Sequence, residues 1–408
     1  MAFFLSTVTL LWGGMHLYLV SRILAGLRLG GYGQGWPAAL PYALAGLLVA
    51  FSMGSLFLIR KTGNTTAAGN ALTLAAYGYM GLFFTFLFLV LVRDLGWLVW
   101  SAGARILGTA TGLGAEPLLP SPARRAMIFN ATHLAAALAT GGMAVTGFRS
   151  AMRLPAYKRV TLRFPNLPAG LEGFRIAQIT DIHIGAPLNR AQLAAIVAKT
   201  NALGADMIAL TGDLVDGSVK TFASEVAPIG DLKAPHGVYF VTGNHEYYSG
   251  HQAWCEEVAR LGLTVLNNEH RIVARGGARL LVGGVTDFTG GQFDPSHASD
   301  PKKALAGAPD HDFRLLLAHQ PKSIPAAVEA GFDLQLSGHT HGGQFFPGPL
   351  FVGLFNPLAA GLGRFGNLQC YVSRGTGCWG PPSAWAPHPK SPRSPSREGR
   401  VLASMHPV

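Results

Sequence analysis

The sequence has few charged residues, and the shortage is local. Charged side chains make up 13% of the 408 residues, whereas soluble domains typically carry about 25%. Residues 1–150 contain only two acidic residues, Asp94 and Glu116. A segment with so little charge is poorly suited to a water-exposed surface. We therefore expect residues 1–150 not to be surrounded by water.

Cysteine is also scarce, and the basic residues form no stripe. The three cysteines, Cys255, Cys370 and Cys378, argue against a disulfide framework and show no zinc-ribbon spacing. The formal net charge is +11, but residues 151–382 hold 19 basic and 18 acidic residues without a basic stripe and interleaved aromatics. Nucleic-acid binding is therefore not expected. The basic excess of the first part is better explained as a determinant of membrane topology.

Four apolar runs occupy the first part of the chain, at residues 3–21, 36–59, 71–92 and 126–148. Each approaches the roughly 20 residues that cross about 30 Å of hydrocarbon at about 1.5 Å per residue. Residues 1–150 are thus predicted to form an all-α membrane domain of four transmembrane helices. A signal peptide is the alternative for the first run, but three more runs follow it. A weaker segment at 95–107 is predicted to be interfacial, because it contains Arg105, Trp97 and Trp100.

From residue 157 onward, short apolar strands alternate with amphipathic helices, which predicts an α/β domain over residues 157–382. The predicted strands include 175–182, 207–211, 237–242, 313–318 and 334–337. Each of these five segments contains Asp, Asn or His at its end or is followed by one of them within two positions. In open α/β sheets, sites form beyond the carboxyl ends of the strands. We therefore expect the five polar clusters to meet in one site.

The polar clusters contain metal-ligand residue types but no thiolate. They comprise Asp181, His183, Asp213, Asn244, His245, His319, His339 and His341. This mixture of carboxylate, imidazole and amide oxygen suits Mn²⁺, Fe or Zn²⁺. So many ligands exceed the needs of one ion and suit two ions about 3.5–4 Å apart, an arrangement used for phosphate ester hydrolysis. Taken singly, Asp213 and Asp216 are better explained as helix caps or turn residues, so the inference depends on the whole set.

The order and spacing of these blocks resemble the calcineurin-like metallophosphoesterase family. The matching blocks are D-x-H at 181–183, G-D-x-x-D at 212–216, G-N-H-E at 243–246 and G-H-T-H at 338–341, with His319 before the last block. The phrases G-G-Q at 342–344 and S-R-G-T-G at 373–377 resemble the membrane-tethered bacterial phosphodiesterase branch. The four-run front half also resembles animal transmembrane proteins with a metallophosphoesterase domain. The resemblance covers about residues 172–380.

The resemblance implies a centre of two divalent metal ions, with Mn²⁺ favoured and Fe or Zn²⁺ as alternatives. The first ion would be held by Asp181, His183 and His341. The second ion would be held by Asn244, His319 and His339. Asp213 would bridge the two ions as a catalytic ligand. His245 would act on the substrate as a catalytic residue, and Asp216 would orient a ligand from the second shell.

The resemblance further implies a four-layer αββα sandwich. The activity implied is hydrolysis of a phosphodiester, phosphomonoester or pyrophosphate by an activated bridging hydroxide. A membrane anchor makes a lipid-linked substrate a candidate. The alternative is a catalytically silent membrane receptor or scaffold that uses the same fold for binding. A transporter ranks lower, because the apolar runs contain no acid and no Lys/Arg pair.

The expected location is the bacterial inner (plasma) membrane, as a multi-pass integral protein. Charges in the short loops lean slightly toward an exported catalytic domain. The cluster Arg149, Arg153, Lys158 and Arg159 favours the opposite orientation.

The end of the chain departs from the family pattern. Residues 383–408 are rich in Pro, Ser and Arg and are predicted to be disordered. The family pattern calls for a short apolar strand after residue 382. A shift of reading frame near residue 383 in the source gene is the alternative explanation for this segment.

Overall fold

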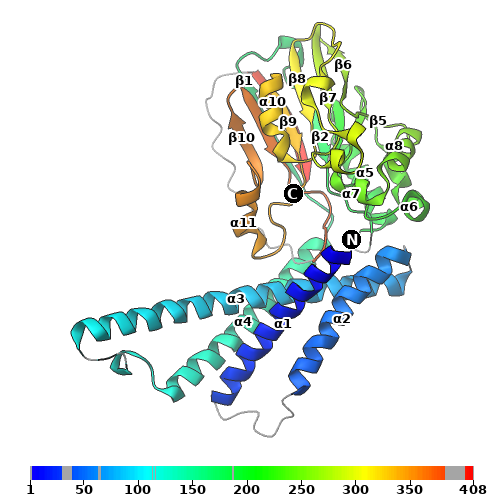
Figure 1. Ribbon diagram of the computed structural model, residues 1–408. Coiled ribbons are helices and arrows are strands. Elements are labelled where there is room, and N and C mark those ends of the chain that lie inside the picture. Colours follow the sequence, from blue (N-terminus) through cyan, green and yellow to red (C-terminus); the bar gives the residue numbers. More distant parts are fainter. Residues whose placement is uncertain are drawn as a thin grey trace. The chain divides into compact units, whose positions relative to one another are not determined.

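The computed structural model describes residues 2–29, 39–62, 66–112, 114, 116–185, 188–381 and 400–407. The chain divides into two units, a helical one and an α/β one (Figure 1). Residues 1–62 and 72–148 belong to the helical unit. Residues 63–71 and 149–408 belong to the α/β unit.

The helical unit contains α1 (Ala2–Leu29), α2 (Ala39–Thr62) and most of α3 (Ala67–Thr111) and α4 (Pro122–Ala151). Three stretches are long and apolar enough to cross a membrane: Ser6–Leu29, Ala67–Thr111 and Pro122–Ala151. They correspond to three of the four predicted spans. Within α2 only the shorter apolar stretch Ala39–Ser55 is recognised among the described residues, so the span at 36–59 stays a prediction.

The predicted interfacial segment at 95–107 is not a separate element. It is continuous with the third apolar run in α3, which has 45 residues. At about 1.5 Å per residue such a helix is roughly twice as long as the hydrocarbon core is thick, so only part of α3 can lie in hydrocarbon. No proline interrupts the sequence between the two segments, and Gly96 is tolerated within the helix.

The α/β unit contains two mixed six-stranded sheets. The first has the order β1-β12-β2-β3-β4-β5, formed by Tyr157–Phe164, Arg400–Pro407, Arg175–Ile179, Met207–Thr211, Val238–Val241 and Thr264–Val265. The second has the order β10-β11-β9-β8-β7-β6, formed by Gly361–Phe365, Leu368–Val372, Leu334–Ser337, Phe313–Leu317, Ala278–Gly284 and Glu269–Arg275. Strands β12 and β2–β5 are mutually parallel, as are β11, β9, β8 and β7.

Both sheets bury their apolar side chains in a shared core. Ile176 and Met207 of the first sheet pack in one cluster with Leu315 and Leu336 of the second. A second cluster joins the first sheet to α5 (Arg190–Ala202), α6 (Val219–Val226) and α8 (His251–Arg260). A third joins the second sheet to α9 (Pro301–Ala304) and α10 (Ile324–Ala330). The predicted α/β class is therefore confirmed.

Local sequence explains several of these elements. Strand β3 is apolar throughout except for its last residue and is buried at every position, as expected for a central parallel strand. Helix α5 begins at a capping box, in which the Asn189 side chain accepts from the Gln192 amide and Gln192 returns the bond. Two short helices, α7 (Asn244–Ser249) and α11 (Gly348–Phe355), lie in loops that follow strand ends.

The end of the chain corrects the prediction of a disordered tail. Arg400–Pro407 forms β12, which pairs antiparallel with β1 over eight residues and parallel with β2. Without β12, the facing edges of β1 and β2 would have no strand between them. Backbone pairing overrides composition here, because unpaired strand edges in a sheet offer free donors and acceptors. The remainder of the predicted tail lies outside the described residues.

Candidate metal centre

The predicted site residues follow the carboxyl ends of five strands, β2, β3, β4, β8 and β9. The loops after β2 and β3 run side by side, because the amides of Asp181 and His183 donate to the carbonyls of Gly212 and Asp213. The loops after β8 and β9 are joined in the same way, by the Gly338 amide and the His319 carbonyl. The two pairs of loops meet where the His339 amide donates to Asp181 Oδ1 at 2.9 Å, so residues 158 positions apart lie together at one edge of the α/β unit.

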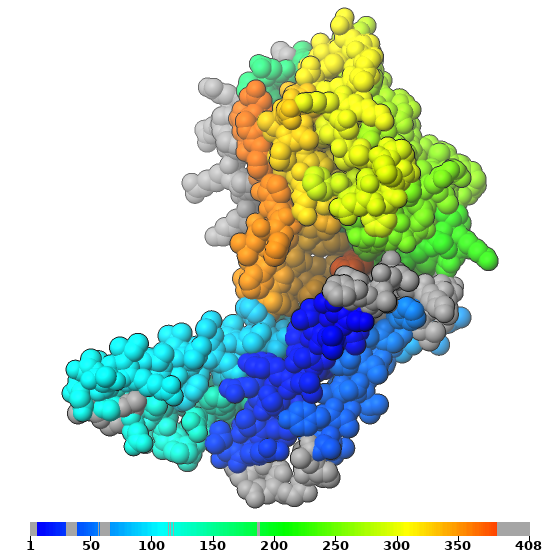
Figure 2. All heavy atoms as spheres, viewed as in Figure 1, coloured from blue at the N-terminus to red at the C-terminus, as the bar shows by residue number. Residues whose placement is uncertain are grey.

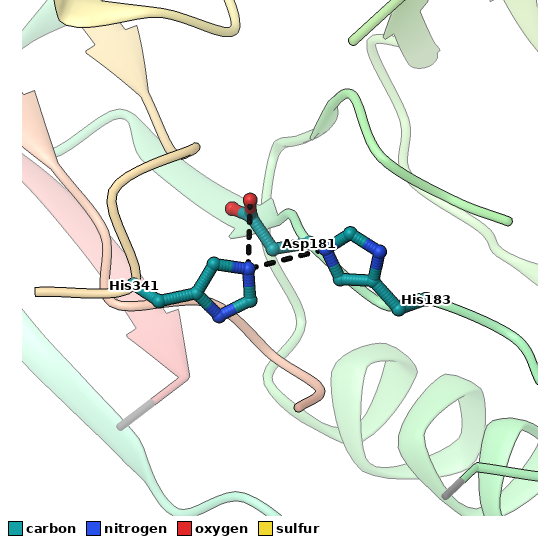
Figure 3. Close-up of side chains that lie close together, drawn as sticks. All are labelled: Asp181, His183 and His341. Atoms are coloured by element: carbon teal, nitrogen blue, oxygen red, sulfur yellow. Dashed lines mark hydrogen bonds and ion pairs between the residues drawn. The ribbon is translucent and has the colours of Figure 1, made fainter. Parts of the chain in front are cut away.

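A first group consists of Asp181, His183 and His341, whose ligand atoms lie within 4.8 Å of one another (Figure 3). His341 Nε2 lies 3.4 Å from Asp181 Oδ1 and 3.1 Å from His183 Nε2. Figure 3 shows the His341 imidazole approaching Asp181 and His183, which belong to one loop, from a different loop. The structure therefore brings together the three side chains predicted for the first ion.

A second group consists of Asp213, His319 and His339, within the same 4.8 Å limit. Asp213 Oδ2 lies 3.1 Å from His319 Nε2 and 3.7 Å from His183 Nε2. The Asp213 carboxylate therefore lies between the two groups. Asn244 sits between Gly243 and His245 in sequence, and the His245 amide donates to Asp213 Oδ1 at 2.9 Å. The Asn244 Oδ1 atom is buried and meets no hydrogen-bond donor among the described residues.

Backbone strain is concentrated at this edge. Among the described residues, six non-glycine residues have positive φ: Asp181, His183, Asp213, Asn268, His339 and His341. All but Asn268 belong to the two groups. A left-handed backbone is uncommon for residues other than glycine and costs on the order of 1–3 kcal/mol each. Such strain persists where the surrounding structure fixes it, and it gathers at functional sites.

Two glycines allow the loops to approach the carboxylates. A Cβ atom at Gly338 would clash with the Asp181 carboxylate, and one at Gly243 would clash with that of Asp213. Both contacts fall well inside van der Waals distance. The G-N-H-E and G-H-T-H blocks therefore need glycine in the first position for steric reasons.

Asp216 connects the first group to His245. Its Oδ1 atom lies 3.0 Å from His183 Nδ1 and 2.6 Å from His245 Nδ1. Burial raises the pKa of the Asp216 carboxyl, but the charges of His183 and His245 and their hydrogen bonds lower it well below its usual range. Burial lowers the pKa of His245, whereas the Asp213 charge and the Asp216 hydrogen bond raise it to about 9. Both carboxylates thus favour the protonated form of the His245 imidazole.

Glu246 belongs to the G-N-H-E block, but the sequence alone did not indicate a role for it. Its buried carboxylate accepts from the amides of Gly243, Asp213 and Leu214, at 2.6, 3.0 and 2.8 Å. Burial, followed by the Asp213 charge, raises the pKa of Glu246 to about 7. Glu246 therefore ties the β3 and β4 loops together and fixes the backbone of Asp213. The signal in the sequence was the place of Glu246 directly after His245, in the G-N-H-E block.

Aromatic side chains flank His245 and were also missed. The ring of Trp379 lies 5.4 Å from that of His245, and the ring of Tyr248 lies 5.3 Å away, both edge to face. Trp379 and Tyr248 are partly exposed. They form walls beside the imidazole on which an apolar or aromatic part of a substrate can pack. Neither belongs to a metal-ligand block, so pattern reasoning had no means to select them.

A third group lies apart from Asp213. His251, Asp294 and His297 bring their ligand atoms within 4.8 Å of one another, and His251 Nε2 lies 3.5 Å from Asp294 Oδ2. Tyr247 stacks on His251 and its hydroxyl lies 2.9 Å from His297 Nδ1. Sequence reasoning did not connect these residues, because 46 positions separate the two histidines.

Residues 174–343 match the family described as Calcineurin-like phosphoesterase. A transmembrane protein with metallophosphoesterase domain from Danio rerio is 35% identical over 60% of this chain and 58% of its own length. An uncharacterized metallophosphoesterase from Helicobacter pylori (strain J99 / ATCC 700824) is 36% identical over 64% of this chain and 69% of its own length. A putative metallophosphoesterase from Caenorhabditis elegans is 39% identical over 51% of this chain.

The matched region spans little more than half of the Danio rerio protein and 45% of the Caenorhabditis elegans protein. The name of the Danio rerio relative and the three long apolar helices both indicate a membrane protein. The family match falls on the region that carries both metal-ligand groups. The chain therefore belongs to the calcineurin-like phosphoesterase family.

Proposed function

We propose that this protein hydrolyses a phosphoester at a centre of two divalent ions held at the strand ends. The position of Asp213 carries the proposal: one carboxylate lies between two groups of ligand side chains, 3.1 Å from His319 and 3.7 Å from His183. A bridging carboxylate between two ions is the arrangement that phosphate ester hydrolysis employs. The native metal is proposed to be Mn²⁺, with Fe or Zn²⁺ as alternatives.

The residues fit such a pair of ions. Asn244 presents a buried amide oxygen with no donor among the described residues, a costly arrangement unless a cation satisfies it. His319 places Nδ1 2.7 Å from the Thr211 carbonyl, which fixes the tautomer that leaves Nε2 free to ligate. His183 is oriented similarly, with Nδ1 on Asp216. Carboxylate, imidazole and amide ligands without thiolate agree with the proposed metals.

The proposed assignment of ligands follows the two groups. One ion would be held by Asp181, His183 and His341, and the other by Asn244, His319 and His339, with Asp213 shared. When bound, the ions would lower the pKa of water toward neutrality and neutralise charge on the phosphoryl oxygens. The Glu246 carboxylate keeps the Asp213 backbone in place for this role.

His245 is proposed as the acid for the leaving group. Asp216 holds Nδ1, so the proton on Nε2 is the one available to a substrate. As water attacks phosphorus and the ester P–O bond breaks, the leaving oxygen takes that proton, and His245 regains one from solvent. Trp379 and Tyr248 confine the imidazole and shield this transfer from bulk water.

The proposal also includes the setting of the domain. We infer four membrane spans, because α2 has 24 residues, enough to span hydrocarbon. We infer the αββα layering, because one apolar cluster lies between the sheets and two lie between sheet and helices. We keep the bacterial inner membrane as part of the proposal, because several relatives come from bacteria and three helices of this chain are long and apolar enough to cross a membrane.

The test is hydrolysis of bis-p-nitrophenyl phosphate and p-nitrophenyl phosphate by the full chain in detergent. The protein is stripped of metal and then titrated with Mn²⁺, Fe²⁺ or Zn²⁺. We expect no turnover without metal, restored turnover at two ions per chain, and a loss of at least about a thousandfold in Asp213→Asn, since metal charge stabilisation is worth several kcal/mol. The exposed Asp231→Asn serves as the matched control. Metal-independent turnover, or full binding of two ions with no turnover of either ester, would contradict the proposal.

A further inference from the structure

Helix α11 places an apolar surface next to the metal centre. Leu354 is 74% exposed and Phe355 is 71% exposed, and α11 has no buried residue. Figure 2, in which the residues around 350 are orange, shows this segment on the surface of the α/β unit. Residues 342–363 contain no charged side chain, although the rest of this unit is well charged. Isolated exposed apolar residues are ordinary, but a continuous uncharged helix of them marks an interaction surface.

The segment that carries α11 leaves the metal-ligand loop and returns to it. Gly343, two residues after His341, lies in van der Waals contact with Gly348 at the start of the helix. After the helix, the Ala359 carbonyl accepts from the Thr340 hydroxyl at 2.5 Å. Both ends of the excursion are therefore fixed to the G-H-T-H block. Any surface on which α11 docks is held at a fixed distance from the site.

Trp379 extends the same apolar surface toward His245. The Gln344 side chain donates to the Trp379 carbonyl at 2.8 Å and accepts from its amide at 3.1 Å. The Trp379 side chain is 41% exposed. The α11 segment and the aromatic wall of the site are thus parts of one hydrogen-bonded assembly of loops.

The attachment to the membrane-candidate helix lies at the same edge. Helix α4, a candidate span, ends at Ala151. Within the α/β unit, Ala151 and residues 153–155 line a small cavity together with Thr376, Gly377 and Cys378. The Gly377 amide donates to the Asp181 carbonyl at 2.9 Å. The chain therefore enters the α/β unit beside the metal-ligand loops, within a few residues of a membrane-candidate helix.

The charge around this entry also fits a membrane surface. Arg149 and Arg153 are exposed on either side of the end of α4. Arginine at this position can meet anionic headgroups while apolar side chains enter the acyl boundary, as interfacial helices do. An apolar helix on the α/β unit, and a basic entry into this unit that directly follows a membrane-candidate helix in the sequence, point to a lipid bilayer as the occupant.

We propose that α11 inserts its apolar side chains into the surface of the bilayer beside the metal centre and thereby presents lipid-borne phosphoesters to the site. The proposed insertion is supported by the exposure of α11 and by the contacts that fix both ends of its segment. The delivery of a lipid headgroup rests on the proposed phosphoesterase function.

Spin-label accessibility tests the insertion without any reference to activity. The full chain is reconstituted in vesicles of phosphatidylethanolamine and phosphatidylglycerol, with Cys255 replaced by Ser and a label at Leu354→Cys. Val328→Cys on α10, whose side chain is also exposed, is the matched control. We expect the label at 354 to collide with oxygen in the lipid rather than with a water-soluble nickel complex, and the label at 328 to show the reverse. A label at 354 that is open to water, or shielded from both reagents by protein, overturns the proposal.

A second measurement tests the delivery of substrate. We compare turnover of a phosphatidyl ester in the same vesicles with turnover of bis-p-nitrophenyl phosphate. In Leu354→Asp the ratio of lipid to soluble turnover is expected to fall about tenfold, the scale of one Leu side chain removed from hydrocarbon. Val328→Asp should leave the ratio unchanged. An unchanged ratio in Leu354→Asp contradicts this proposal, whereas absence of soluble turnover in the unmodified protein contradicts the proposed function instead.

Discussion

Asp94 in the helical unit and Asp213 in the α/β unit are both carboxylates surrounded by basic side chains. Asp94 lies 2.6 Å from Arg22 and 2.7 Å from Arg93, and it accepts from the Tyr18 hydroxyl at 2.5 Å. Guanidinium groups remain charged under all ordinary conditions. The charge of the Asp94 carboxylate is therefore neutralised by cations that the chain itself supplies, and the cluster joins α1 to α3.

Asp213 has a different set of neighbours. The imidazoles of His319, His183 and His245 lie 3.1, 3.7 and 3.9 Å from its Oδ2 atom, and their charge depends on protonation. The Asp213 backbone is in the left-handed region, with φ of 52°, whereas Asp94 lies within a regular helix. A carboxylate that is neutralised by permanently charged side chains of its own fold has a structural role. Histidines that can be neutral, grouped around a carboxylate on a strained backbone, are suited to bind metal cations.

The largest effect that would sharpen this contrast is expected for His245→Gln. The substitution removes the proton donor but no proposed ligand, so kcat should fall by about 10²–10⁴ while the metal content stays at that of the unmodified protein. Turnover of bis-p-nitrophenyl phosphate and metal analysis of the same sample provide the measurement. His236→Gln, a histidine away from the centre, is the control. A parallel loss of metal would show that His245 is a ligand rather than an acid.

Asp216→Asn should have a smaller and mixed effect. It weakens the acceptor for both His183 and His245, so metal affinity should fall about 10–100-fold, as for other outer partners of ligands. Asp216 helps to raise the pKa of His245 to about 9, so its loss lowers that pKa. An acid must be protonated to act, so the alkaline limb of the pH–rate profile should move to lower pH. An alkaline limb at the same pH in Asp216→Asn would show that Asp216 does not influence the pKa of the acid His245.

Asp94→Asn should produce the opposite pattern. It leaves Arg22 and Arg93 without their counter-ion, which should destabilise the helical unit by about 1–3 kcal/mol, the cost of an unpaired polar group. Thermal unfolding of the helical signal in detergent measures this loss. Metal content and turnover of a soluble ester should stay unchanged. A change in metal content would show that the two clusters are coupled, which breaks the contrast.

The smallest effect is expected for Lys302→Ala, which removes an exposed ion pair with Glu329 on the α/β unit. Both side chains are more than half exposed, so the change in unfolding free energy should stay below about 1 kcal/mol. Chemical denaturation of Lys302→Ala and unmodified protein side by side gives the comparison. A larger loss would mean that surface charge contributes to this unit as strongly as the buried clusters do.

The sequence sufficed for the α/β class and the family because the relevant signals are local. Each strand that leads to the centre is a short apolar run, and its ligand residues follow within a few positions, as in Met207–Thr211 before Asp213. The length and apolar composition of three helices can likewise be seen in continuous segments of the sequence. Hydrophobic period and residue type are fixed along the chain, so they can be read without knowing the fold.

Other features could not be predicted from the sequence, and the reasons are again physical. The continuity of α3 through residues 95–107 depends on whether a helix bends or ends, and amphipathic composition does not decide that. The pairing of Arg400–Pro407 between β1 and β2 depends on edges formed more than 200 residues earlier. A strand can be stabilised by its neighbours despite poor local composition.

The sequence by itself determined three features of this protein: an apolar helical part, an α/β part and a set of candidate metal-ligand residues that follow strand ends. Only the tertiary structure decided that Asp213 lies between two ligand groups, that Asp216 joins His183 to His245, and that α11 projects from the ligand loop. These relations connect atoms from strands far apart in the chain. Their distances are set by sheet pairing and core packing, which no local pattern encodes.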